Sequence, residues 1–267
     1  MGKEFKFNMT QDKRLRYLIR FLLNENSEYS TLQIPAAGQE QKKLLRSLMN
    51  VRLPRPISPE FLEIQDAYLQ EELHEKKVTS LLDLSPVKDG IYLWKGDITT
   101  LQTDGIVNAG NSGLLGCFVP CHGCIDNAIH SFAGIQLRLA CQEIMERQQS
   151  GEPVGKAKIT EAYNLPSRFV LHTVGPVIHG RLGEEDCVLL ASCYRSCLEL
   201  ADTYHLKSIA FCCISTGEFH FPNETAAQIA VNTVTAYRKN THAEMEVVFN
   251  VFGEKDYSIY QQLLRKN

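Results

Sequence analysis

The chain has 267 residues, of which 44% are hydrophobic and 22% charged, a composition typical of folded globular proteins. Its net charge of −3 argues against a nucleic-acid-binding or membrane-binding protein, because both usually carry a concentrated basic patch. It has no apolar run long enough to cross a bilayer and no apolar signal-peptide core at its start, so we expect a cytoplasmic protein.

Residues 1–80 predict a helical N-terminal extension without a catalytic motif. In residues 13–25 the apolar residues recur at spacings of three and four, which places them on one face of a helix. A second helix is expected over residues 39–49. A third is expected over residues 59–77, with Ser58 as its N-cap and Pro59 at its first position. The main domain should therefore occupy residues 81–267.

From Gly90 onward strand-like and helix-like segments alternate, which indicates an α/β sandwich with a mixed or parallel sheet. The strands are expected at 91–95, 105–108, 157–162, 169–173, 208–214 and 246–251. The helices are expected at 124–132, 135–147, 184–205, 222–238 and 256–264.

The nine cysteines accompany no secretion signal, so we expect free thiols rather than disulfides. Five of them lie in apolar segments and should pack in the core: Cys187, Cys193, Cys197, Cys212 and Cys213.

Four soft metal ligands fall within eight residues, namely Cys117, Cys121, His122 and Cys124. Zinc binds Cys thiolates and His nitrogens, with four protein ligands in structural sites and three in catalytic sites. Because no second ligand pair follows at a distance, the cluster favours an open functional site. The alternative is a set of buried thiols beside a surface histidine.

Polar residues follow three of the predicted strands, where ligands of α/β proteins usually bind. Asn108 and Asn111 could bind sugar hydroxyls, or could be turn residues that satisfy their own backbone. Asp97 could accept a hydrogen bond from an exocyclic amine, or could cap a turn. The segment from Ser215 to Gly217 could bind a diphosphate through its N–H groups, or could be a plain connection.

Asp126 lies at the start of a predicted helix. The helix dipole alone would favour an acid at this position. A functional interpretation makes Asp126 a base or a water-positioning group beside a bound sugar.

Together these segments resemble the macrodomain family over residues 80–267. The motifs GDIT, VNAGNSGLLG, IDNAIH, HTVGP and ISTGEFHFP occur in the family's order. The stretch GCFVPCHGC stands where many family members have a glycine-rich segment, and it is similar to the microbial zinc-containing branch, which also has a helical N-terminal extension.

The resemblance implies a three-layer α/β/α domain with a mixed central sheet, preceded by the extension. It implies that Cys117, His122 and Cys124 hold one Zn²⁺, whereas Cys121 falls at a variable position. It further implies that Asp97 and the Ile98 backbone bind adenine, that Asn111 contacts the distal ribose, and that Asp126 and Asn111 serve catalysis. The diphosphate would lie against Ser215, Thr216, Gly217, Glu218 and Phe219.

The activity implied by the resemblance is zinc-dependent removal of mono-ADP-ribose from acidic side chains of modified proteins. The implied substrate is a lipoylated carrier resembling the glycine cleavage H protein, and the implied functional partner is a class M sirtuin. Zinc, Asp126 or the phosphate of the substrate could activate the water. The alternative is a non-catalytic ADP-ribose-binding module in which zinc only holds the loop.

Overall fold

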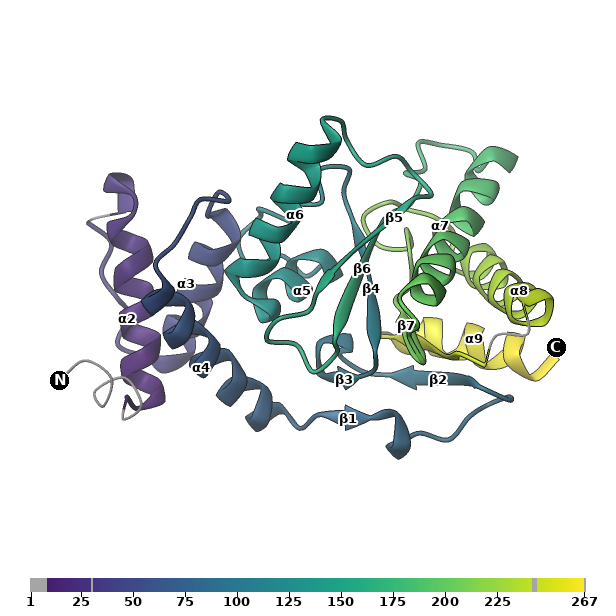
Figure 1. Cartoon of the computed structure of the whole chain (residues 1–267), viewed down its shortest axis with the longest axis horizontal. Helices are drawn as coiled ribbons and strands as arrows, with labels where there is room; N and C mark the ends of the chain where they lie inside the picture. Colours follow the sequence, from purple (N-terminus) through teal and green to yellow (C-terminus); the bar gives the residue numbers. More distant parts are fainter. Residues whose placement is uncertain (1–8, 30, 242–243, 267) are drawn as a thin grey trace.

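The computed structural model describes residues 9–29, 31–241 and 244–266, so the first eight residues of the predicted extension lie outside the described part. Figure 1 shows the N-terminal helices at one end of the molecule and a sheet flanked by helices at the other. None of the helices in the described part is long and apolar enough to cross a membrane.

The N-terminal helices confirm the predicted amphipathic segments. They are α2 (Gln11–Asn24), α3 (Gly38–Val51) and α4 (Pro59–Lys76). Their apolar faces form a core of their own, in which Leu18, Ile19 and Phe61 are fully buried, and Ile135 of the following domain packs into the same core. The Ser58 hydroxyl accepts a hydrogen bond from the Phe61 N–H at 3.2 Å, which confirms the predicted N-cap.

The central sheet is mixed. Its strands are β2 (Ile91–Lys95), β4 (Gly105–Gly110), β5 (Ala157–Glu161), β6 (Phe169–Val174), β7 (Ser208–Phe211) and β8 (Glu246–Val251). The spatial order is β2-β8-β7-β4-β6-β5, and every neighbouring pair is parallel except β5 with β6. Two short strands, β1 (Thr79–Ser80) and β3 (Leu101–Gln102), pair with each other.

Strand β7 is three residues shorter than predicted. The apolar run favoured a strand over residues 208–214, but β7 ends at Phe211, where its pairing with β8 stops. The following residues are apolar because they are buried, not because they pair: Cys212 is 6% exposed and Ile214 is fully covered. The chain leaves the sheet three residues early and enters a loop at its edge.

Helices cover both faces of the sheet, so the domain has three layers. In Figure 1, α5 (Ile125–Ala133) and α6 (Ile135–Gln148) lie on one side of the sheet. On the other side lie α7 (Glu184–Thr203), α8 (Asn223–Thr241) and α9 (Glu254–Lys266). Gly134 separates α5 from α6 with φ +99°, a conformation that strains other residues.

Three of the five cysteines expected in the core are fully covered or nearly so, namely Cys193, Cys197 and Cys212. Cys187 and Cys213 differ: they are only partly buried and pack against the edge of the core.

The parallel strands bring the candidate residues to one edge. Their carboxyl ends lead to Asp97 after β2, Asn111 after β4, Gly175 after β6 and Ser215 beyond β7. Because carboxyl ends of neighbouring parallel strands lie at the same edge, residues far apart in the sequence meet there.

Candidate functional site

Asn111 and Asp126 lie side by side at this edge. The Asn111 Nδ2 is 3.4 Å from the Asp126 Oδ2 and 3.3 Å from the Gly116 carbonyl oxygen. The Asn111 Oδ1 accepts a hydrogen bond from the Gly113 N–H at 3.0 Å, which fixes the orientation of the amide. The two residues predicted to serve catalysis are thus brought together by the loop between β4 and α5.

Asp126 is buried and has a second amide partner. Its side chain is 7% exposed, and its Oδ1 accepts a hydrogen bond from the Asn108 Nδ2 at 2.8 Å. Burial raises the pKa of this carboxyl to about 6, while the Asn108 hydrogen bond opposes the rise. The group is therefore ionised at neutral pH but is a stronger base than an exposed aspartate.

Asn108 is held in turn by His172 of β6. The Asn108 Nδ2 lies 3.2 Å from the His172 Nδ1, and the His172 Nε2 lies 2.9 Å from the Thr160 Oγ1. Burial lowers the pKa of His172 to about 3, so the ring is neutral and its Nδ1 can accept from the amide. The sequence suggested that Asn108 is either a sugar contact or a turn residue, whereas the structure places it behind the Asp126 carboxylate.

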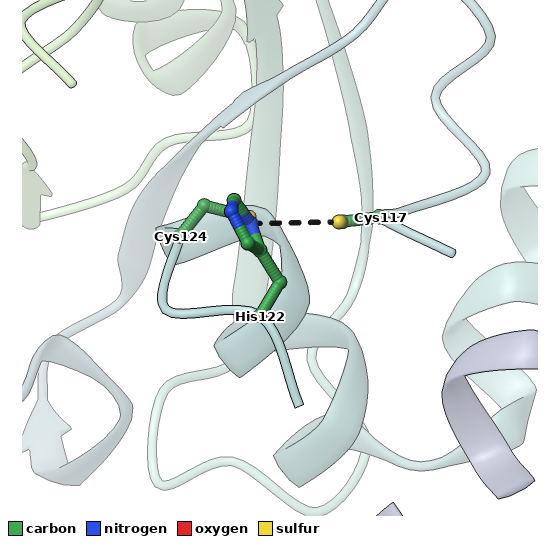
Figure 2. Close-up of side chains that lie close together, drawn as sticks. All are labelled: Cys117, His122 and Cys124. Carbon is green, nitrogen blue, oxygen red and sulfur yellow. Dashed lines mark hydrogen bonds between the residues drawn. The ribbon is translucent and has the colours of Figure 1, made fainter. Parts of the chain in front are cut away.

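A cluster of three soft ligands lies in the loop 117–124, just before α5. The ligand atoms of Cys117, His122 and Cys124 all lie within 4.8 Å of one another, and the Cys117 Sγ is 3.7 Å from the His122 Nδ1. Figure 2 shows the side chains of Cys117 and Cys124 turned toward the His122 ring. Ligands placed about 2.0 to 2.3 Å from a tetrahedral zinc ion are roughly 3.5 Å apart, so the spacing fits such an ion.

The chemistry of the cluster also fits a cation. Burial raises the pKa of the Cys124 thiol to about 11, so a nearby cation is needed to hold its thiolate at neutral pH. Cys121 lies apart from the cluster: its side chain is exposed and its Sγ lies 3.3 Å from the Ser47 Oγ. Three ligands therefore converge, and the fourth candidate, Cys121, faces α3.

A second soft cluster lies deeper in the fold. The side chains of His130, Cys141 and His172 are buried, and their ligand atoms lie within 4.8 Å of one another. Burial raises the pKa of Cys141 to about 12 and lowers that of both histidines. These neutral side chains pack behind Asp126, and the His172 nitrogens already have polar neighbours.

The loop 215–219 bends sharply at the sheet edge. Ser215 is 6% exposed with φ +64°, and a Cβ on Gly175 would lie 2.0 Å from its Oγ. Only glycine therefore fits at position 175, in the HTVGP motif. Within the described part of the chain, the N–H groups of Gly217, Glu218 and Phe219 donate to no protein acceptor, and nothing lies within 4 Å of a Cβ built on Gly217. Free N–H groups beside open space can bind an anion.

Glu218 connects this loop to the metal-ligand cluster. Its Oε1 lies 3.6 Å from the His122 Nε2, the ring nitrogen on the side away from Cys117. The two loops therefore face each other across the edge of the sheet. A carboxylate on the second nitrogen of a ligating histidine is a common way to orient that ring.

Asp97 caps the short helix η3 (Ile98–Thr100). Its Oδ1 accepts hydrogen bonds from the Thr99 N–H at 3.0 Å and from the Thr99 hydroxyl at 2.6 Å. The capping role that the sequence offered as an alternative is thus confirmed for Oδ1. The other oxygen, Oδ2, accepts a hydrogen bond from no group in the described residues. Ile98 is 1% exposed, so only its backbone is available to a ligand.

Phe252 is an aromatic residue that sequence reasoning missed. It is 83% exposed and directly follows β8. It is close to Asp97, because the Gly96 N–H donates to the Val251 carbonyl oxygen at 3.0 Å. The signal was available in the sequence: an apolar strand ending in Phe-Gly rather than in a polar turn.

Known proteins resemble this chain in sequence and in fold. The Macro domain family model matches residues 107–230. A Treponema medium protein named protein-ADP-ribose hydrolase is 56% identical, over 96% of this chain and 100% of its own. A Staphylococcus aureus (strain MRSA252) protein of the same name is 49% identical, over 95% of this chain and 96% of its own. A Trypanosoma brucei macrodomain solved in complex with ADP-ribose is 31% identical, with a TM-score of 0.64, over 81% of this chain and 94% of that chain.

Proposed function

The chain belongs to the macrodomain family, and we propose that it is a zinc-dependent hydrolase that removes mono-ADP-ribose from acidic side chains of modified proteins. The coarser statement, that the chain is a protein-ADP-ribose hydrolase, rests on two relatives of that name that match it over nearly its full length. The observation that carries the finer statement is the contact of Asp126 with Asn111 beside a three-ligand cluster, whose His122 faces a loop with free N–H groups.

The edge of the sheet offers a partner for each part of ADP-ribose. The free Oδ2 of Asp97 and the Ile98 backbone would bind the exocyclic amine and ring of adenine, and the exposed Phe252 ring could stack on the base. The loop formed by Ser215, Thr216, Gly217, Glu218 and Phe219 would hold the diphosphate through its N–H groups. The Asn111 Oδ1, which takes one hydrogen bond from the Gly113 N–H, would then accept a second from a hydroxyl of the distal ribose.

Asp126 is proposed as the base of the reaction. Hydrolysis breaks the bond between the anomeric carbon of the ribose and an oxygen of the protein side chain, and a water supplies the new oxygen. Asp126 would accept the proton of that water, and its raised pKa makes it a better acceptor. The Asn108 and Asn111 amides keep the two carboxylate oxygens in place.

The same geometry supports an acidic target side chain. A carboxylate is a stable leaving group at neutral pH, so its departure needs no proton donor. One base is therefore sufficient for an ester-linked ADP-ribose, whereas a serine-linked one would also need an acid.

Cys117, His122 and Cys124 would hold the zinc ion. When bound, zinc would act as a Lewis acid at the ribose end of the site. Cys117 and Cys124 would contribute thiolates, and the Cys124 thiolate is further favoured by its place at the N-terminus of α5. Glu218 would orient the His122 ring.

The proposed substrate is a cytoplasmic carrier protein of the lipoylated, glycine cleavage H type, modified by a class M sirtuin. The test is release of ADP-ribose from that carrier, compared with a serine-linked substrate. Preferential release from acidic side chains supports the proposal. Tight binding of ADP-ribose without release from either substrate would make the chain a binding module instead.

A further inference from the structure

The N-terminal extension reaches the loop 117–124 through α3. Arg46 and Asn50 are one helical turn apart on this helix, so both face the same neighbour. Their partners lie more than 70 residues away along the chain, in and beside the loop 117–124. The loop itself contains no helix or strand, so its conformation depends on such contacts.

Arg46 bridges the loop and α5. Its Nη2 donates to the His122 carbonyl oxygen at 3.1 Å and to the Asn127 Oδ1 at 2.7 Å, and its Nε donates to the same Oδ1 at 3.1 Å. The guanidinium therefore fixes the backbone of His122, one of the three candidate metal ligands, relative to α5.

Asn127 extends this contact to the rest of the loop. It is completely buried, and its Nδ2 donates to the Val119 carbonyl oxygen at 2.9 Å and to the Cys117 carbonyl oxygen at 3.5 Å. Its backbone N–H lies 3.4 Å from the Cys124 Sγ. Because Arg46 occupies the Asn127 Oδ1, the amide is oriented with its NH₂ group toward the loop.

Asn50 holds the loop at a second point. It is 1% exposed, and its Oδ1 accepts a hydrogen bond from the Cys121 N–H at 2.9 Å. Its Nδ2 donates to the Ser131 Oγ of α5 at 2.9 Å. This anchor supports the backbone of Cys121, whose φ of +51° is unfavourable for a residue with a side chain.

The end of α3 that carries Asn50 is itself fixed. Arg138 of α6 is 5% exposed and donates to the carbonyl oxygens of Met49, Asn50 and Arg52 at 2.6 to 3.0 Å. Its Nε also donates to the Leu115 carbonyl oxygen at 2.6 Å. These carbonyl groups at the helix end would otherwise lack partners.

We propose that Arg46 and Asn50 are positioning residues that hold Cys117, His122 and Cys124 in the arrangement that binds metal. This inference rests on the proposed function, because it assigns the extension a role in the same site. The proposed division into residues 1–80 and 81–267 then separates two segments that share one site. Residues that support metal ligands typically change metal affinity by 10- to 100-fold when they are removed.

The first test is amide hydrogen exchange of the full chain, with and without zinc. Arg46→Ala should raise the exchange of amides in residues 118–124 about tenfold or more in the zinc-free chain. Lys43→Ala is the matched control: it removes a positive charge from the same helix, and among the described residues the Lys43 side chain bonds only Glu40. The contact of Lys43 with Cys121 is made by its backbone carbonyl, which this substitution keeps. Exchange in Arg46→Ala equal to that of the unmodified chain would overturn the proposal.

The second test is zinc affinity, measured by competition with a chelator, together with steady-state hydrolysis. Arg46→Ala and Asn50→Ala should each weaken zinc binding about 10- to 100-fold and lower kcat, with KM and ADP-ribose affinity unchanged. Unchanged zinc affinity in both variants would overturn the proposal, and so would equal losses in Lys43→Ala.

A folding defect and a failure of the proposed function remain distinguishable. If Arg46→Ala also loses ADP-ribose binding, Arg46→Lys decides: it keeps the charge, lacks the Nε–H that donates to Asn127, and ends one bond short of the Nη2 that joins Asn127 to His122. It should therefore bind ADP-ribose and still bind zinc more weakly. If chelation leaves hydrolysis by the unmodified chain unchanged, zinc dependence fails, while the exchange experiment still decides whether α3 holds the loop.

Discussion

The Asn111 Nδ2 and the Asp126 Oδ2 lie 3.4 Å apart, although 15 positions separate the two residues. The connecting loop carries the three candidate metal ligands and returns to the sheet edge through α5. One loop therefore positions the proposed sugar-binding amide, the proposed base and the candidate metal ligands. The proposed role of each of these groups can therefore be tested by its own substitution.

Asp126→Asn should lower kcat about 100-fold or more, because it removes the proton acceptor while keeping the size of the side chain. ADP-ribose affinity should stay within about twofold, since the diphosphate and adenine contacts lie on other loops. Single-turnover release and calorimetric binding of ADP-ribose measure the two quantities. A kcat equal to that of the unmodified chain would show that Asp126 is not the base.

Asp97 has two roles that substitution can separate. Asp97→Ala should lose both the cap of η3, at a cost of about 1 kcal/mol of stability, and the contact with adenine. Asp97→Ser should keep the cap and lose only ADP-ribose affinity. Thermal unfolding and ADP-ribose titration test this, and equal ADP-ribose affinity in Asp97→Ser and the unmodified chain would refute the adenine contact.

Phe252→Ala should weaken ADP-ribose binding about tenfold, because stacking of a base on an aromatic ring contributes about 1 to 3 kcal/mol. Binding of ribose 5-phosphate, which lacks the base, should not change. Leu82→Ala is a suitable control, since Leu82 is 96% exposed and lies in η2 (Leu81–Asp83), away from the carboxyl ends of the parallel strands. Equal losses of affinity for both ligands would argue against stacking.

The buried, neutral His172 should make the folded state less stable as the pH falls. Its folded-state pKa of about 3 lies below the usual 6.5, so below pH 6.5 the unfolded chain binds a proton that the folded chain does not. The stability contributed by neutral His172 is therefore lost as pH falls, by about 1.4 kcal/mol per pH unit. The raised pKa of Asp126 has the opposite effect on stability as pH falls. Asp126 is present in both the unmodified chain and His172→Gln, which are compared next.

The measurement is urea unfolding of the unmodified chain and of His172→Gln between pH 7 and pH 4.5. The difference in stability between the two should shrink as pH falls below 6.5. A difference that stays constant over this range would mean that His172 does not remain neutral in the folded state.

Much of the fold could be predicted because periodicity reports burial. The amphipathic spacing of α2 and the strand pattern of β2 and β8 were confirmed almost to the residue. The predicted end of β7 was wrong because Cys212 and Ile214 are buried without being paired, and an apolar run does not distinguish burial from pairing.

The candidate site could be predicted in part, because its ligands cluster in short motifs. Cys117, His122 and Cys124 are close in sequence as well as in space. Arg46 and Asn50 could not be identified in this way, since their roles depend on contacts across more than 70 residues. Asn108 was found, but its place behind Asp126 depends on the register between β4 and β6.

The most direct measurement is zinc content together with single-turnover release of ADP-ribose from a carrier modified on an acidic side chain. Both would be followed before chelation, after chelation and after zinc is restored. We predict one zinc ion per chain, loss of release on chelation without loss of ADP-ribose binding, and recovery with zinc. Release at an unchanged rate from fully chelated protein would contradict zinc dependence and would leave the reaction to Asp126 and the substrate.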